Sequence, residues 1–405
     1  MDDKLIPVSA APSVTTIFNE IVSNIENYFR KYPPGQVVTP TPVRNTLKYN
    51  GQPVRPAPKI YDITDIIESV RLMQSDKDRK KRRSLIYNVT KYNIFGSGDD
   101  FERLIKFLFS LQDYYSALIL CLYCLKTPGK MNSVTLLSLI IELCRHLGQE
   151  TFPIADTCMY ILQQHARWDV EVYSYCVAYL QAKAFALQSE AVANLPGNHG
   201  KIDDTVIKEY ILLLVQAAEM AEDCKKSYPY DETGYFLCAK VSIQQGSKEK
   251  AKKQLRQVIF EMLPQGDPEH PPQILKCPKC CLLLLTLYDN EEDTKLIQEI
   301  ADKYISIEGS QDLFFVLYRQ AEAIFYEQGM GNCSEFLPSS PSEAVIRLIN
   351  RYKMAEEQIP PEYLPDIYPE TIWPHLDYRS SIQKRCKYLS GCLTLINLKN
   401  PQKEL

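Results

Sequence analysis

Apolar residues recur at intervals of three and four along almost the whole chain from about residue 84 to residue 398. This period matches the turn of an α-helix, so the pattern predicts an all-α fold whose joints are marked by proline and glycine. Three segments have a strand-like composition: "YSYCVAYL", "CCLLLLTLY" and "DLFFVLY". Each continues into a longer helical pattern, and we therefore predict helices there and no β-sheet.

Residues 1–60 combine a predicted amphipathic helix with a proline-rich extended strap. In the segment "SVTTIFNEIVSNIENYFRKY", one helical stripe is formed by Ile17, Ile21, Ile25 and Phe29. The prolines that follow exclude helix and favour an extended backbone. An apolar stripe of this size needs a surface to bury against, so we expect residues 1–60 to dock on the helical array or on a partner. We favour the array, because its first hairpin otherwise presents an uncapped apolar face.

Residues 61–83 are predicted to form a helix that is capped by Asp62 or Thr64 and ends in a basic run. The run consists of Lys77, Arg79, Lys80, Lys81, Arg82 and Arg83, interrupted by Asp78. Three interpretations stay open. The run is a solvated face that favours the helix dipole, a patch for an acidic protein partner, or a signal for nuclear import or nucleic-acid binding.

A pattern of small residues stands out between residues 205 and 263. Ala217 and Ala251 lie 34 residues apart, with Pro229 and Gly246 between them. Small residues let two helices approach closely where they cross, and glycine permits a sharp turn between them. The segment therefore predicts three helices joined by tight connections.

This pattern resembles the tetratricopeptide repeat, whose units are helical hairpins of about 34 residues. An upstream unit carries Asp113, Tyr114 and Ala117 at the matching turn and helix positions, with Gln112 where the family has glycine. Weaker units extend the resemblance over most of residues 84–358. A proline-interrupted segment and a capping helix are expected in residues 359–405. The resemblance implies a right-handed superhelical array of antiparallel helix pairs, an α-solenoid.

The resemblance also implies a groove that is lined by the first helix of each hairpin and suits an extended peptide or a partner helix. The family pattern places the following residues on that surface: Glu102, Lys106, Phe109, Ser110, Phe236, Lys240, Ile243, Gln244, Leu282, Thr286, Asp289 and Asn290.

Composition narrows the functional classes. The 405 residues are 45% hydrophobic, enough for a sizeable core, and the formal net charge of -4 gives no global positive footprint for nucleic acid or anionic lipid. The first residues lack the leader of a secreted protein, and the apolar runs are too short to span a bilayer. We expect a soluble cytoplasmic protein without membrane association, with the nucleus as the alternative compartment.

Candidate catalytic and metal-binding residues are few. Cys121 with Cys124, and Cys277 with Cys280, form two Cys-x-x-Cys pairs that together would suit a four-thiolate zinc site. Both pairs lie in apolar helical patterns, which favours buried thiols over zinc binding or redox chemistry. No phosphate-binding loop, nucleophile motif or pair of histidines at ligand spacing occurs in the sequence. We expect a protein that is not an enzyme and that needs no cofactor or metal.

The sequence thus predicts a non-enzymatic adaptor or scaffold, a subunit of a larger assembly that binds one or more partner proteins through the groove. The alternative is a nuclear factor that contacts nucleic acid through the basic run and uses the helical body as a docking platform.

Overall fold

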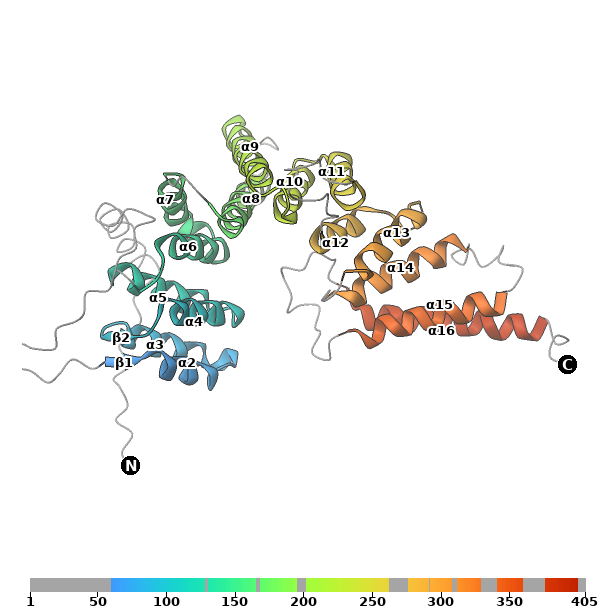
Figure 1. Cartoon of the computed structure of the whole chain (residues 1–405), viewed down its shortest axis with the longest axis horizontal. Coiled ribbons are helices and arrows are strands. Elements are labelled where there is room, and N and C mark those ends of the chain that lie inside the picture. The colour runs from blue at the N-terminus through green and yellow to red at the C-terminus, as the bar shows by residue number, and fades with distance from the viewer. Residues whose placement is uncertain are drawn as a thin grey trace, which may run out of the picture. The chain divides into compact units, whose positions relative to one another are not determined.

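The structure is a computed structural model, and it is an all-α array of fifteen helices within the described part of the chain (Figure 1). The described residues are 60–127, 130–164, 168–194, 202–261, 276–290, 292–307, 312–328, 341–359 and 376–399. The predicted helix and strap in residues 1–59 lie outside them. The chain divides into two compact units at residues 220 and 221.

The helices of the first unit are α2 (Ile63–Arg71), α3 (Arg79–Val89), α4 (Gly98–Ser110), α5 (Tyr114–Lys126), α6 (Ser133–Leu147), α7 (Phe152–Gln163), α8 (Val170–Ala193) and the first part of α9 (Asp204–Ser227). From α4 to α8, each of them packs on the next in the sequence. Helices two apart in the sequence also touch, because α2 contacts α4, α3 contacts α5, and α6 contacts α8. The helices of this unit therefore follow one another in two rows (Figure 1).

The second unit, taken by itself, has a similar arrangement of helices. Its helices are α10 (Glu232–Gln244), α11 (Lys248–Phe260), α12 (Pro278–Leu287), α13 (Thr294–Ile305), α14 (Leu313–Glu327), α15 (Pro341–Glu357) and α16 (Tyr378–Lys399). Each described helix packs on the next, and α10 and α14 both contact α12. One continuous apolar core runs through the unit, from Ala239 in α10 to Ile396 in α16.

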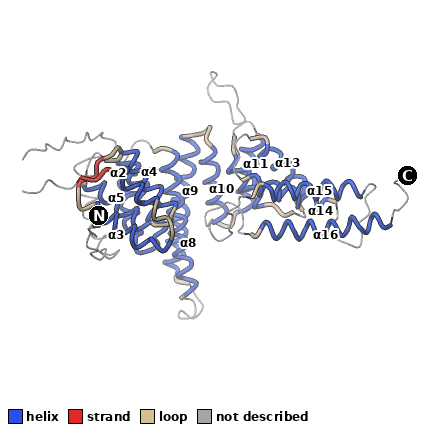
Figure 2. Tube along the Cα trace, turned by 90° about the horizontal axis from the view of Figure 1, so that it is seen from below, coloured by secondary structure: helices blue, strands red, loops and turns tan. Residues whose placement is uncertain are grey.

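A short parallel sheet corrects the prediction that the chain has no strands. β1 (Ile60–Asp62) pairs with β2 (Asn93–Phe95), and the α2–α3 hairpin connects them. Figure 2 shows the two strands at the edge of the first unit beside α2. The Ile94 N–H donates to Tyr123 Oη at 2.8 Å, and the Ile94 carbonyl accepts from Lys130 Nζ at 2.6 Å. These contacts satisfy the backbone of Ile94 without a further strand.

The basic run also differs from its predicted place. The helix that Asp62 caps ends at Arg71, and a 3₁₀ turn, η1 (Asp76–Asp78), separates it from α3. The run therefore begins a helix instead of ending one, so the helix dipole does not favour its charges. The α2–α3 hairpin packs on α4 and α5 and exposes polar side chains, among them Asp65 and Glu68. These side chains give this end of the array a polar outer surface, so the hairpin itself provides the cap that was expected from residues 1–60.

Two turns, one in each unit, share a backbone conformation. Gln112, between α4 and α5, and Gly246, between α10 and α11, have φ angles of 54° and 78°. The Gln112 N–H donates to the Phe109 carbonyl at 2.8 Å, and the Gly246 N–H donates to the Ile243 carbonyl at 2.9 Å. Gln112 thus adopts the left-handed conformation that glycine accepts without strain.

Candidate functional site

The basic run is the strongest charge feature of the sequence, and the structure divides it. Lys77, Lys80 and Lys81 are exposed, whereas Arg82 has no exposed surface. Local carboxylates pair with two members, since Arg79 Nη2 lies 2.8 Å from Asp76 and Lys81 Nζ lies 3.2 Å from Asp78. The exposed part of the run is therefore a set of lysines interleaved with acidic side chains.

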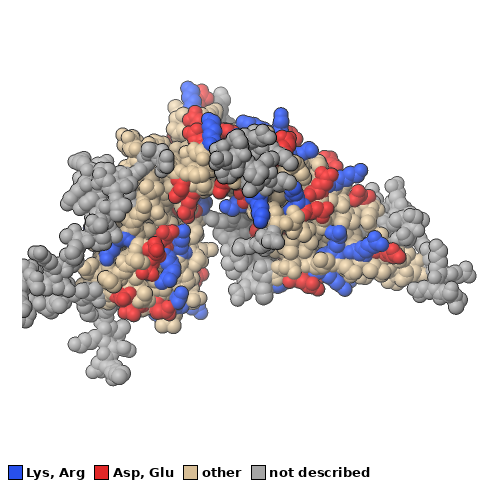
Figure 3. Space-filling model, viewed as in Figure 1, with Lys and Arg blue, Asp and Glu red and all other residues tan. Residues whose placement is uncertain are grey.

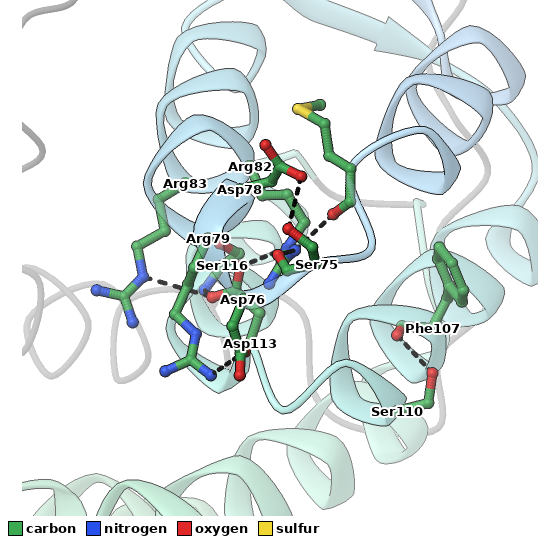
Figure 4. Close-up of polar contacts among 11 residues, drawn as sticks. Ser75, Asp76, Asp78, Arg79, Arg82, Arg83, Phe107, Ser110, Asp113 and Ser116 are labelled. Atoms are coloured by element: carbon green, nitrogen blue, oxygen red, sulfur yellow. Dashed lines mark hydrogen bonds and ion pairs between the residues drawn. The ribbon is translucent and has the colours of Figure 1, made fainter. Parts of the chain in front are cut away.

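Arg82 enters the core of the first unit, where it meets Asp113 (Figure 4). Its Nε donates to Asp113 Oδ2 at 3.1 Å, and its Nη1 donates to the carbonyls of Met73 at 2.5 Å and Ser75 at 2.9 Å. Both charged side chains are fully buried. The arginine thereby ties the loop after α2 to the start of α5.

The Asp113 carboxylate accepts hydrogen bonds from several donors at once. Its Oδ1 accepts from Arg83 Nε at 3.4 Å and from the Ser116 backbone N–H at 3.4 Å, so the same carboxylate caps α5. The Arg83 guanidinium also stands 4.7 Å from the ring centroid of Tyr115. A buried pair needs such additional hydrogen bonds to offset the loss of hydration.

Four of the six basic residues are thus paired with carboxylates. Lys77 and Lys80 are the two for which the described part of the chain offers no carboxylate within salt-bridge distance. Sequence reasoning did not connect Asp113 with the run, because the two are about thirty positions apart. The only available signal was the charge of Asp113 at the start of a strongly apolar helix.

The predicted groove residues of α4 lie on a face that α4, α6 and α8 form together. Lys106 of α4 lies 2.8 Å from Glu102 and 3.5 Å from Glu171 of α8. The hydrogen bond to Glu102, together with the charges of both carboxylates, raises the pKa of Lys106. Tyr175 donates its hydroxyl to Glu171 at 2.7 Å. We call this surface the α4/α6/α8 face.

Aromatic and charged side chains of α6 complete this face. The His146 ring stacks on Tyr114 at 4.6 Å between centroids and meets the edge of Phe109 at 4.8 Å. Arg145 binds Glu142 through two hydrogen bonds of 2.9 and 2.5 Å. Burial acts to raise the pKa of Glu142, but hydrogen bonds from His146 and Arg145 outweigh it and hold the pKa below its usual value. Ser110 is exposed and bonds the carbonyl of its own helix.

The predicted groove residues of the second unit differ in exposure, from buried to exposed. Lys240 is exposed and lies 5.5 Å from the ring centroid of Phe236, while Ile243 and Gln244 are half-buried. Leu282 is only 3% exposed and belongs to the core, so it offers no open surface to a partner. The last members flank the end of α12: Thr286 and Asn290, which are half-buried, and Asp289, which is exposed.

The cysteines of both Cys-x-x-Cys pairs are buried, as the helical pattern predicted. Desolvation raises the pKa of Cys124 and of Cys280, so both favour the neutral thiol. Cys280 also lies at the start of α12, where its N–H donates to Glu232 at 3.1 Å. Within the described ranges, no group of three or more His, Cys, Asp or Glu side chains is arranged to hold a metal ion.

Charge is mixed on the surface that Figure 3 presents, where acidic and basic side chains alternate over the described helices. None of the helices searched, all in the described part of the chain, combines the length and the apolar character that crossing a membrane requires. Comparison of the chain with models of known families, with curated proteins and with solved structures finds no significant match in any of the three.

Proposed function

We propose that the chain is a non-enzymatic scaffold, a subunit of a larger protein assembly that binds an extended peptide or a helix of a partner on the α4/α6/α8 face. In this proposal the helix pairs form a right-handed array similar to tetratricopeptide repeats. Such arrays expose the first helix of each pair as a continuous binding surface.

The observation that carries the proposal is the continuity of this face across three helices. Lys106 bridges from α4 to Glu171 of α8, and His146 of α6 packs against Phe109 of α4. Exposed charges beside half-buried aromatic rings are the composition that interfaces favour, since rings provide contact area and charges provide specificity. In the second unit, Phe236 and Lys240 form a similar combination of a half-buried ring and an exposed charge.

Affinity purification of the tagged full chain at its endogenous level, followed by mass spectrometry, tests the proposal. Lys106→Glu reverses a half-exposed charge on the face, and Lys80→Glu makes the same change at an exposed position elsewhere. We expect Lys106→Glu to lose a protein partner that the wild type and Lys80→Glu both recover, while all three melt alike. Equal recovery by all three chains would contradict the proposal.

The nucleic-acid alternative has little support from the basic run. Arg82 is inaccessible, and carboxylates pair with Arg79, Lys81 and Arg83. A nucleic-acid binder would lose affinity steeply between about 50 and 200 mM salt, because phosphate contacts release counterions. We expect no such salt-dependent binding to a duplex oligonucleotide.

A further inference from the structure

An apolar run in the first unit is only partly covered. In α9, residues 211–215 read Ile-Leu-Leu-Leu-Val, and only Leu213 and Leu214 are buried. Four large apolar side chains in this half of the helix are between 41% and 56% exposed: Ile207, Ile211, Leu212 and Val215. We call these four residues the α9 stripe. Contiguous exposed apolar surface of this kind marks a contact site.

The α9 stripe has the geometry of a helix-docking surface. Ile207, Ile211 and Val215 are spaced by four residues, so they lie on one side of α9, and Leu212 widens that side. The helices α8 and α9 each have 24 residues, whereas α4 and α5 have 13. The end of α8 and the start of α9 extend beyond the shorter helices of the unit (Figure 2). The exposure of Ile207 and Ile211 agrees with this, since both lie in the first third of α9.

The chain itself contains a segment of matching pattern. Ile17, Ile21 and Ile25 are also spaced by four residues, in a stretch whose periodicity predicts a helix of about five turns. The first hairpin of the array already carries a polar outer surface, so it needs no cover from this segment. The α9 stripe is an apolar surface in the same unit that does need cover.

The connection between the two is long enough. Residues 33–59 separate the predicted helix from β1, which belongs to the same unit as the α9 stripe. A proline-rich strap of this length spans roughly 80 Å at about 3 Å per residue, more than twice the roughly 36 Å length of a 24-residue helix.

We propose that residues 13–32 form a helix that docks in cis on the α9 stripe, placing Ile17, Ile21 and Ile25 against Ile207, Ile211 and Val215. A second copy of the chain could offer its own α9 stripe instead. The tether, however, holds the N-terminal segment at an effective concentration of roughly millimolar, far above that of a free second copy. This inference does not depend on the partner-binding role proposed for the α4/α6/α8 face.

Hydrogen-exchange mass spectrometry on the full-length chain tests the docking in both directions. In the wild type, amides of residues 13–32 should exchange at least about tenfold more slowly than in the Ile211→Asp/Val215→Asp variant. The reciprocal variant, Ile21→Asp/Ile25→Asp, should speed exchange in residues 204–215 while leaving the array folded, because neither residue belongs to its described core. The control Tyr160→Asp places one aspartate at an exposed aromatic position of α7, outside both segments, and should change the exchange of neither.

Three results would overturn the proposal. Free exchange of residues 13–32 in the wild type would show that no docking occurs in the isolated chain. Protection that weakens on tenfold dilution, together with a dimer mass in light scattering, would assign the α9 stripe to a second copy. Protection that survives both double variants would place the segment on another surface.

Discussion

Arg82 carries a charge in the core of the first unit. The stability of this unit therefore depends on the one carboxylate that pairs with Arg82, that of Asp113. Three acceptors surround the arginine, but two are backbone carbonyls, and only Asp113 neutralises its charge. Breaking a buried pair by removing one charge is far more damaging than replacing both partners, since the remaining charge stays desolvated. Asp113 also caps α5, so its loss affects two elements.

Asp113→Asn should therefore lower the free energy of unfolding by about 3–5 kcal/mol, measured by urea denaturation. Lys80→Ala, in the same basic run but exposed, should stay within about 0.5 kcal/mol of wild type. The reverse order, with the lysine variant the less stable, would mean that the buried pair does not anchor the hairpin.

The lowered pKa of Glu142 predicts that the free energy of unfolding depends on pH. Because the folded pKa of this carboxyl lies below its ordinary value of 4.5, the folded state binds its proton less readily than the unfolded state. The resulting stabilisation is complete above the unfolded pKa and is lost as the pH falls through the folded pKa. Glu142→Gln should thus be less stable than wild type at pH 7, by roughly 1–3 kcal/mol.

Urea unfolding of the wild type and of Glu142→Gln, measured from pH 7 down to about pH 3, checks this pH dependence. The difference in stability should shrink once the pH drops below about 4.5. A difference that is constant over the whole range would assign the effect of the substitution to packing instead of charge.

At the scale of elements, the α4–α5 and α10–α11 turns need the same left-handed residue and use different amino acids. Glycine takes this conformation freely, whereas another residue has its Cβ close to a backbone oxygen at a cost of about 1–2 kcal/mol. Gly246 therefore adopts the conformation without strain, whereas at Gln112 the same conformation destabilises the fold.

Gln112→Gly should accordingly stabilise the first unit by about 0.5–1 kcal/mol, after the larger chain entropy of glycine in the unfolded state is subtracted. Gly246→Val should destabilise the second unit by about 1–2 kcal/mol or more. Thermal and urea unfolding of both variants would measure these changes. If the two substitutions shift stability in the same direction, the shared turn conformation does not control it.

At the scale of the whole molecule, the division at residues 220 and 221 predicts that damage stays local. In arrays of helical pairs each pair contacts its neighbours, so a substitution weakens the nearest elements most. In Asp113→Asn, hydrogen exchange should speed up in α3 to α5 and remain at the wild-type rate in α12 to α16. Uniform acceleration in both units would show that they unfold together.

The buried thiols make a second prediction for the whole chain. All described cysteines are free, and all except Cys386 and Cys392 are buried. A zinc chelator should therefore leave the melting temperature unchanged. A fall in melting temperature, with about one zinc per chain by elemental analysis, would show that thiolates hold a structural metal.

The sequence alone determined the features that rest on neighbouring residues. The first of the three helices predicted between residues 205 and 263 appears as α9, residues 204–227, because its small-residue spacing and the proline after it are local signals. Gly246 marks the turn for the same reason. The all-α class and the burial of the cysteines follow from the same periodicity.

Only the tertiary structure decided the features that join distant residues. Ile60–Asp62 pairs with Asn93–Phe95, and three residues are too few to show the alternation of a strand. Arg82 is buried because Asp113 lies beside it in space, although about thirty positions away in the sequence. Leu282 enters the core while Ile211 stays exposed, and their apolar side chains give the same signal in the sequence. Helical period shows which residues share a face, but what covers that face depends on contacts that the whole fold creates.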